Sequence, residues 1–264
     1  MTILVTGATG NTGRHVVAEL LKRGQAVRAL TRDPARAKVP AGAEVVGGDH
    51  NDASTVSFDG VTGLHITVTK GVAESGPALV EKAVAAGVER ITILWGGYVG
   101  PAEEAVAASG VRWTRLEPEE FMANALDWRA DIAEGVVRAP FPDVLSAVAH
   151  EGDIGEIAAV ALTEDGHDGL VHAVNGPEPL TAPQRVAILS AALGRELRYV
   201  ETSRQDALDK LLAQGVSQAD ADYVVGWHEA PPERAYTPND TIATVLGRAP
   251  RTFAEWAAEN AGRF

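Results

Sequence analysis

The feature that most constrains the fold is a short apolar run, followed by three evenly spaced glycines and a helical pattern, at the start of the chain. Residues 3–5 have the composition of a buried parallel strand. Gly7, Gly10 and Gly13 follow, and residues 16–21 then place apolar side chains on one face of a helix. This order of strand, glycine turn and helix predicts a nucleotide-binding βαβ unit.

Glycine suits such a turn for three physical reasons. It adopts positive φ, it has no Cβ to block a pyrophosphate, and at the third position it lets the helix pack close to the strand. The free N–H groups and the positive end of the helix dipole then face the phosphates. A glycine-rich turn without a ligand is the alternative. The turn residues expected to contact a cofactor are Gly7, Thr9, Gly10, Asn11, Thr12 and Gly13.

The end of the second expected strand, residues 26–31, bears on the choice of cofactor. NAD-preferring folds usually place an acidic residue here for the ribose hydroxyls. This chain has Thr31 followed by Arg32, and an arginine pairs with a 2′-phosphate, so NADP(H) is favoured over NAD(H). Asp33 keeps NAD open, and Arg14 is a second candidate for the phosphate. Arg32 as a solvated loop residue is the alternative.

The third expected strand, residues 43–46, ends in a glycine- and aspartate-rich loop. Asp49 is placed to accept a hydrogen bond from the adenine amino group, because the loop after the third strand passes the adenine ring in folds of this type. A helix N-cap is the alternative for Asp49. The cap is the favoured role of Asp52, before a short helix expected at residues 54–58.

Candidates for the chemistry follow the fourth and fifth expected strands, residues 61–68 and 89–94. Ligands bind beyond the carboxyl ends of the strands in open parallel sheets, which places Thr69 and Lys70 on the nicotinamide side. Lys70 would hold the ribose or an oxyanion there, and Tyr98 would protonate the substrate. The alternatives are a solvated lysine and a surface or packing tyrosine.

The alternation of strands and helices predicts an α/β fold with a doubly wound parallel sheet. A sixth strand is expected at residues 111–116, and helices at residues 74–86 and 101–109 connect the later strands. The rhythm changes after Glu117. We therefore expect a Rossmann core at residues 1–130 and a small α+β substrate lobe at residues 131–264, with some chain returning to the core.

The later elements have weaker patterns. They are expected as an amphipathic helix at 119–131, a strand at 144–149, a helix at 153–162 capped by Asp153, a strand at 170–174, a helix at 181–193, a strand at 197–200 and a mostly helical tail from Ser203.

Composition excludes several classes of function. A formal net charge of −13 argues against nucleic acid or an anionic membrane as a partner. The absence of cysteine excludes disulfides and thiol catalysis, and the seven histidines are scattered without metal-ligand spacing. Without a signal peptide or a long apolar run, we expect a cytoplasmic monomer or homodimer that acts on a small molecule.

One pattern covers residues 6–13, 31–34, 48–49, 112–116, 121–124, 153–158, 175–178, 247–248 and 251–256. Together these segments resemble the NmrA-like branch of the atypical short-chain dehydrogenases. The resemblance implies a Rossmann sheet, NADP(H) binding and a small C-terminal substrate lobe. It does not imply one chemistry, since members look like reductases of quinones, enones or small carbonyls, like aromatic-ring reductases, or like cofactor sensors without turnover.

The chain departs from the main short-chain dehydrogenase mechanism, which uses a Tyr-x-x-x-Lys pair. The residues four positions after the four tyrosines are Ala102, Ser203, Trp227 and Asp240. Ordinary ketone reduction is therefore disfavoured. A quinone or an enone needs less acid help, because its developing negative charge is delocalised. Hydride transfer to a small quinone, enone or aromatic carbonyl compound is therefore the expected function. The alternatives are a non-catalytic NADP(H)-sensing regulator and a redox-neutral tailoring enzyme, such as a cyclase or epimerase.

Four further residues have both a functional and a structural interpretation. Glu117 ends the sixth strand where the family more often has arginine, and it is either a site residue or a helix-start carboxylate. His150 faces the pocket or is structural, and Trp95 and Trp113 wall an aromatic pocket or belong to the core.

Overall fold

The computed structural model describes residues 1–264 except for the side chain of Lys70. The chain forms two compact units. The sheet unit comprises Met1–Pro118, Glu151–Val174 and Thr241–Arg248, and the lobe unit comprises Glu119–His150, Asn175–Asp240 and Ala249–Phe264. The simpler boundary expected at residue 130 stays a prediction.

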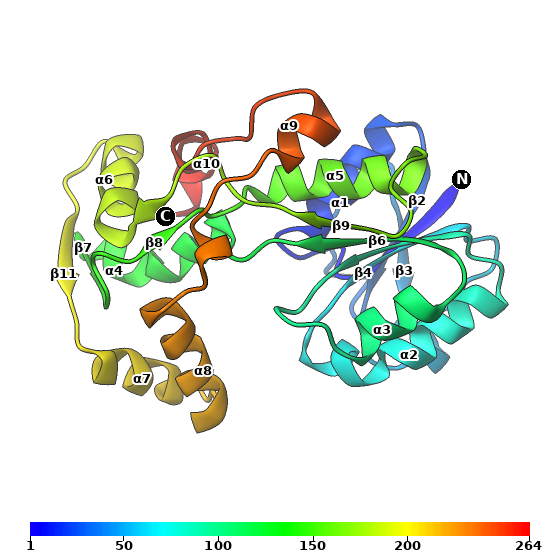
Figure 1. Ribbon diagram of the computed structural model, residues 1–264, viewed down its shortest axis with the longest axis horizontal. Coiled ribbons are helices and arrows are strands. Elements are labelled where there is room, and N and C mark those ends of the chain that lie inside the picture. Colours follow the sequence, from blue (N-terminus) through cyan, green and yellow to red (C-terminus); the bar gives the residue numbers. More distant parts are fainter. The chain divides into compact units, whose positions relative to one another are not determined.

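The sheet unit is built on seven parallel strands in the order β3-β2-β1-β4-β5-β6-β9. Strands β6 and β9 lie side by side in this sheet (Figure 1). The first strand lies inside the sheet and the strand order reverses between it and β4, which confirms the doubly wound parallel sheet. The expected six strands gain a seventh, because β9 pairs with β6. The strands are β1 Thr2–Val5, β2 Ala26–Thr31, β3 Glu44–Gly47, β4 Gly63–Thr67, β5 Arg90–Leu94, β6 Arg112–Glu117 and β9 Leu170–Ala173.

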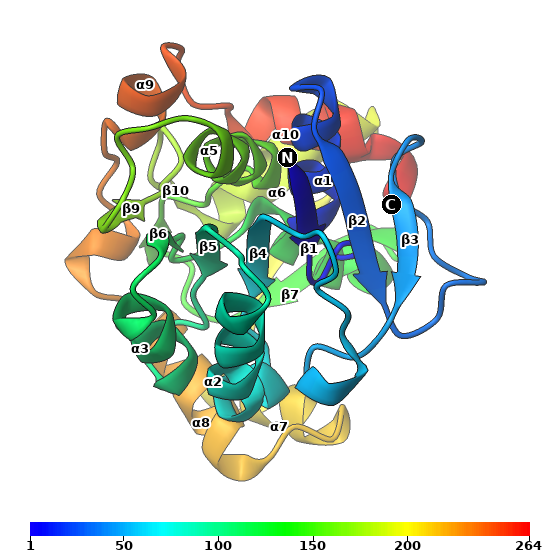
Figure 2. The ribbon, with the colours of Figure 1, turned by 90° about the vertical axis from the view of Figure 1, so that its right-hand side faces the viewer.

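Helices cover both faces of the sheet (Figure 2). Helices α1 (Gly13–Lys22) and α5 (Glu151–Thr163) lie on one face, and α2 (Lys70–Ala85) and α3 (Pro101–Ala108) lie on the other. A side chain at Gly155 of α5 would collide with α1, so the glycine permits close helix packing. Helix α9 (Thr241–Leu246) packs against α5, and the short 3-10 helix η1 (Ala53–Thr55) follows β3.

Burial of alternate strand residues holds the sheet and helices together. Leu64 and Ile66 of β4 join a cluster of buried side chains that includes Leu79 of α2 and Val106 of α3. Because successive strand side chains point to opposite faces, His65 between them lies on the other face. It is fully buried there.

The lobe unit combines two small sheets with helices around its own core. Strand β8 pairs antiparallel with β10, and β7 pairs parallel with β11. Phe253 and Trp256 stack at 5.5 Å between ring centroids, and both are fully buried. The lobe elements are η2 Met122–Trp128, α4 Arg129–Ala133, β7 Val136–Ala139, β8 Leu145–Ser146, β10 Leu180–Thr181, α6 Ala182–Leu193, β11 Arg198–Glu201, α7 Arg204–Ala213, α8 Gln218–Glu229, η3 Glu233–Ala235, α10 Phe253–Asn260 and η4 Ala261–Arg263.

The single helix expected at residues 119–131 is wrong. Phe121 forms a parallel bridge with Ala149, whose N–H donates to the carbonyl of Glu120 at 2.8 Å. This pairing keeps the first residues extended, and only a 3-10 helix and the short α4 follow. The strand expected at 144–149 is paired as β8 over two residues alone.

Two helix starts also differ from expectation. The helix expected from Asp153 begins at Glu151, so Asp153 lies inside the first turn, where its fully buried carboxylate accepts a 2.7 Å hydrogen bond from Arg248. The helix expected from Glu74 begins at Lys70. The Asp153 carboxylate, which the sequence predicts as a helix cap, instead forms an ion pair with Arg248 in the folded protein.

Candidate cofactor and substrate site

The glycine turn between β1 and α1 is closed by its own backbone. Gly7 has a φ of 60°, and its carbonyl accepts a 2.8 Å hydrogen bond from the Gly10 N–H. A Cβ at Gly13 would overlap the carbonyl of Gly7, and one at Gly7 would lie 3.0 Å from Thr67. The turn therefore has no room for side chains at its first and third glycines.

The start of α1 offers donors to an anion. The N–H groups of Asn11, Thr12 and Gly13 have no acceptor in the part of the chain that the structure describes, and the first turn of α1 carries no acidic side chain. Three such N–H groups at the positive end of a helix dipole fit a pyrophosphate. The donor set and the shape of the turn therefore suit a dinucleotide.

Arg32 is exposed at the carboxyl end of β2 and lies near the loop that follows β3. Burial lowers the pKa of His50, the charge of Asp49 raises it, and the charge of Arg32 lowers it further, with a lowered pKa as the net result. These three side chains thus gather at the ends of two neighbouring strands. The sequence offered no signal for His50, because a lone histidine in a loop has no diagnostic spacing.

The two loop aspartates have different partners. Asp49 accepts a 3.0 Å hydrogen bond from the N–H of Asn51, so one of its oxygens shapes the loop itself. Asp52 is the N-cap of η1 and accepts from the Ser54 N–H at 3.0 Å, which confirms the expected cap. The hydrogen bonds from Ser54 also lower the pKa of the Asp52 carboxyl.

A pocket of about 110 Å³ lies beyond the carboxyl ends of β4 and β5. It brings Thr69 and Tyr98 together, as their positions after neighbouring strands predict. The Tyr98 side chain is 58% exposed. Lys70 is the first residue of α2, and its side chain lies outside the described residues. The residues that line the pocket are Val68, Thr69, Ala73, Gly96, Tyr98 and Glu103.

The four residues with two interpretations all have partners within their own unit. Trp95 donates a 3.1 Å hydrogen bond to the Pro118 carbonyl, and Trp113 packs against the sheet core. Glu117 pairs with Arg115 at 2.6 Å. In the lobe unit, buried His150 lies 3.2 Å from Glu259. These contacts favour the structural interpretation of Trp95, Trp113 and His150. The helix-start role of Glu117 is wrong, because Glu117 ends β6 and pairs within that strand, and the next helix begins at Met122.

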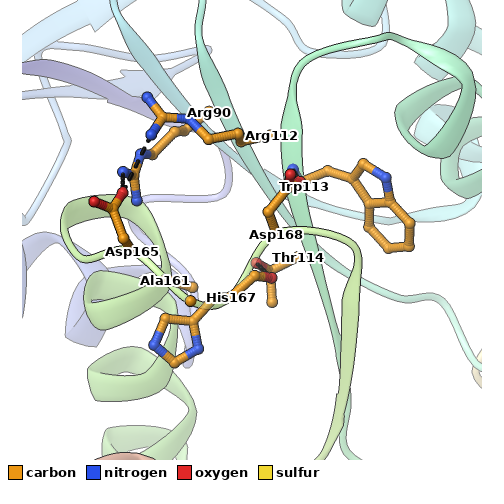
Figure 3. Close-up of a pocket in the computed structure, with 9 residues that line it drawn as sticks. Arg90, Arg112, Trp113, Thr114, Ala161, Asp165, His167 and Asp168 are labelled. Atoms are coloured by element: carbon orange, nitrogen blue, oxygen red, sulfur yellow. Dashed lines mark hydrogen bonds and ion pairs between the residues drawn. The ribbon is translucent and has the colours of Figure 1, made fainter.

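A second hollow lies at the opposite, amino-terminal ends of β5 and β6 (Figure 3). Arg90 and Arg112, which begin these strands, both pair with Asp165 from the loop before β9. The hollow has a volume of about 20 Å³, little more than one water molecule needs. Its size and its edge of the sheet argue against a cofactor or substrate there.

A buried polar network that the sequence did not indicate lies below the glycine turn. His65 Nδ1 is 2.9 Å from the hydroxyl of Thr92, and the Thr67 N–H donates to Thr6 Oγ1 at 2.9 Å. Burial lowers the pKa of His65 to about 4, so the ring is neutral at pH 7. Thr67 is also the residue that Gly7 contacts, so the network supports the turn.

The described residues contain no group of three or more side chains suited to a metal ion, and no described helix is long and apolar enough to cross a membrane. The strand order, the glycine turn and the pocket at the carboxyl edge define a dinucleotide-binding Rossmann protein. The chain belongs to the NmrA-like family, whose model matches residues 1–113.

Relatives align over nearly the whole chain. A (4-alkanoyl-5-oxo-2,5-dihydrofuran-3-yl)methyl phosphate reductase of Streptomyces griseus is 34% identical, with 99% of each chain covered. An NAD(P)H azoreductase of Xenophilus azovorans is 30% identical, again with 99% of each covered. The crystal structure of an Escherichia coli NADPH-dependent quinone oxidoreductase in complex with NADPH is 26% identical, with a TM-score of 0.79 and coverage of 97% of this chain and 99% of that one.

Proposed function

We propose that the chain is an NADP(H)-dependent oxidoreductase that reduces a small quinone, enone or aromatic carbonyl compound. The observation that carries the proposal is the pocket with Thr69 and Tyr98 at the same sheet edge as the glycine turn with its open N–H groups. Relatives that are NADPH-dependent quinone oxidoreductases and NAD(P)H azoreductases support it.

The chain's own residues divide the work of binding. The N–H groups of residues 11–13 hold the pyrophosphate, and Arg32 pairs with the 2′-phosphate. Asp49 takes the adenine amino group with the oxygen that does not accept from Asn51. Thr69 and Lys70 lie at the nicotinamide end, at the start of α2.

The reduction needs one hydride and one proton. The reduced cofactor, when bound, supplies the hydride. Tyr98 donates the proton to the substrate oxygen from its hydroxyl and regains it from solvent, to which its side chain is 58% exposed. A quinone or enone suits this arrangement, because its delocalised negative charge lowers the demand on the acid.

Calorimetric titration with NADPH, NADP⁺, NADH and NAD⁺, followed by NADPH oxidation assays on quinones, enones and simple ketones, tests the proposal. We expect tight NADPH binding and turnover of quinones or enones above that of ketones. Absence of binding to all four nucleotides, or binding without turnover of any substrate, would contradict it.

A non-catalytic NADP(H) sensor is the second candidate, and the missing Tyr-x-x-x-Lys pair favours it. A sensor binds NADP⁺ and NADPH with different affinities and reduces no substrate. A redox-neutral tailoring enzyme would convert its substrate without net oxidation of NADPH. The oxidation assay separates the oxidoreductase from both alternatives, and product analysis of the same reaction mixtures separates the tailoring enzyme from the sensor.

A further inference from the structure

Glu103 makes an unusual pair of contacts beside the candidate pocket. Its side chain lies on α3, and the residue is only 2% exposed. One carboxylate oxygen accepts from the Gly100 N–H at 3.1 Å, and the other accepts from the Gly96 N–H at 3.2 Å. The two N–H groups belong to the two ends of the loop that carries Tyr98.

The first contact alone is ordinary. A glutamate at the third position of a helix commonly accepts from the N-cap N–H, and Gly100 is the N-cap of α3. The contact with Gly96 has no role in capping the helix, because Gly96 lies four residues before the cap. One buried carboxylate thus closes the loop of residues 96–100.

The loop needs such a closure because its own residues do not hold it. Gly96, Gly97 and Gly100 give it high backbone freedom, and Gly97 has a φ of 100°. The ring of Tyr98 lies over Gly100, where an added Cβ would be 3.0 Å from Cε2. The Tyr98 side chain is otherwise 58% exposed, so packing does not fix it.

We propose that Glu103 is a positioning residue that holds Tyr98 at the pocket by tying both ends of its loop. The inference rests on the proposed function, in which Tyr98 is the proton donor. Glu103 acts through the two backbone N–H groups from which its carboxylate oxygens accept hydrogen bonds. Its replacement therefore loosens the loop and lowers kcat without changing the binding of NADPH.

Glu103→Gln is the principal variant. The side-chain NH2 of the glutamine replaces one of the two accepting oxygens, and because an NH2 group donates, one of the two hydrogen bonds from the backbone is lost. Glu104→Gln is the matched control: Glu104 is the next residue of the same helix turn, is exposed, and undergoes the same change of charge. We expect hydrogen exchange of the N–H groups at residues 96–100 to rise about tenfold in Glu103→Gln and to stay unchanged in Glu104→Gln. Equal exchange in the two variants would overturn the proposal.

Kinetics in a second background separate positioning from general damage. In the wild-type background, Glu103→Gln should lower kcat about tenfold and leave the Kd for NADPH within twofold. In the Tyr98→Phe background the same substitution should change kcat less than twofold, because the group it positions is gone. A tenfold loss in both backgrounds would overturn the proposal.

Gly100→Ala tests the same loop if Glu103→Gln fails to fold. The new Cβ at residue 100 would displace the Tyr98 ring, and the φ of −117° at Gly100 is one that alanine adopts without strain. A lower kcat with unchanged NADPH binding is expected, and an unchanged kcat would contradict the role of the loop. Hydrogen exchange at residues 96–100 tests whether Glu103 holds the loop, independently of whether the protein turns over a substrate. A loosened loop in an enzyme that reduces no substrate would leave the closure standing and reject the proposed function.

Discussion

The carbonyl of Gly7 occupies the space that a side chain at position 13 would need. Gly13→Ala must therefore move either the turn or the start of α1, and the N–H groups that face the pyrophosphate move with it. We expect NADPH binding to weaken at least tenfold, and the free energy of unfolding to fall by about 1–3 kcal/mol through overpacking. Calorimetric titration and urea denaturation measure the two effects.

Gly226→Ala is the control for this substitution. Gly226 lies in α8, and an added Cβ would meet no atom within 4 Å. The variant should bind NADPH like the wild type and gain up to about 1 kcal/mol of stability from helix propensity. Equal NADPH affinity in the two alanine variants would contradict the assigned role of the turn.

Arg32→Ala should discriminate between the two nicotinamide cofactors. Loss of a charge-assisted hydrogen bond to the 2′-phosphate costs about 1.5–3 kcal/mol, which raises the Kd for NADPH roughly 10–100-fold. The Kd for NADH should change less than about twofold, since NADH lacks this phosphate. Titrations of both nucleotides with the variant measure the difference.

Arg112→Ala is the matched control, because it removes the same charge at the opposite edge of the sheet. We expect its affinity for both cofactors to equal that of the wild type. If Arg32→Ala instead weakens the binding of NADPH and NADH to the same extent, Arg32 does not bind the 2′-phosphate.

Buried His65 predicts a loss of stability in acid. Its pKa is about 4 in the folded protein and about 6.5 when unfolded, so the unfolded state binds the extra proton between these values. The free energy of unfolding therefore falls as the pH drops below about 6.5, and this group's share of the loss approaches about 3 kcal/mol near pH 4.

Urea denaturation of wild type and His65→Asn between pH 7 and pH 4 isolates this effect, because asparagine does not titrate. The variant should be the less stable of the two at pH 7, where the hydrogen bond to Thr92 is altered. Its disadvantage should shrink or reverse toward pH 4. Parallel stability curves for the two proteins would show that His65 does not cause the acid loss.

A buried ion pair in the lobe unit predicts a large effect from a single substitution. Glu120 and Arg185 are 5% and 8% exposed and lie 3.0 Å apart, and Ser146 donates to the second Glu120 oxygen at 2.5 Å. Burial alone would raise the pKa of the Glu120 carboxyl, but Arg185, the charge of His228 and the hydrogen bond from Ser146 outweigh it and lower the pKa.

Arg185→Met should destabilise the protein by about 3–5 kcal/mol, because it leaves the Glu120 carboxylate buried without its cation. The double variant with Glu120→Gln should recover part of that loss. Glu134→Gln, which breaks the exposed pair with Arg138, should change the stability far less, because solvent screens that pair. Chemical denaturation compares the three, and equal losses for the buried and exposed pairs would contradict the prediction.

Most strands of the sheet unit could be predicted from local patterns in the sequence. The apolar runs of β1 and β5 stand out because buried parallel strands are nearly continuous in apolar residues. Arginines interrupt β2 and β6, and the regular alternation of strands with helices indicates these two strands instead. Strand β9 was expected as a strand but not as the seventh member of the sheet. Its register partners in β6, such as Thr114 and Leu170, are 56 residues apart, and pairing over that distance leaves no local pattern in the sequence.

Only part of the candidate cofactor and substrate site could be predicted from the sequence. The glycine turn and the positions of Thr69 and Tyr98 follow from strand order, which places the carboxyl ends of parallel strands at one edge. The buried carboxylate of Glu103 escaped notice, because in the sequence it is an ordinary residue of a helix start. The role of His65 was not predicted either, because a single polar residue in an apolar strand has no diagnostic pattern.

Local chemistry is sufficient to specify the strand, the glycine turn and the helix, because backbone freedom at glycine and apolar periodicity act over a few residues. The partners of Glu103, His65 and Asp153 depend instead on elements brought together by folding. Burial then makes each of these polar groups costly unless a partner satisfies it, so only the packed tertiary structure assigns the partner.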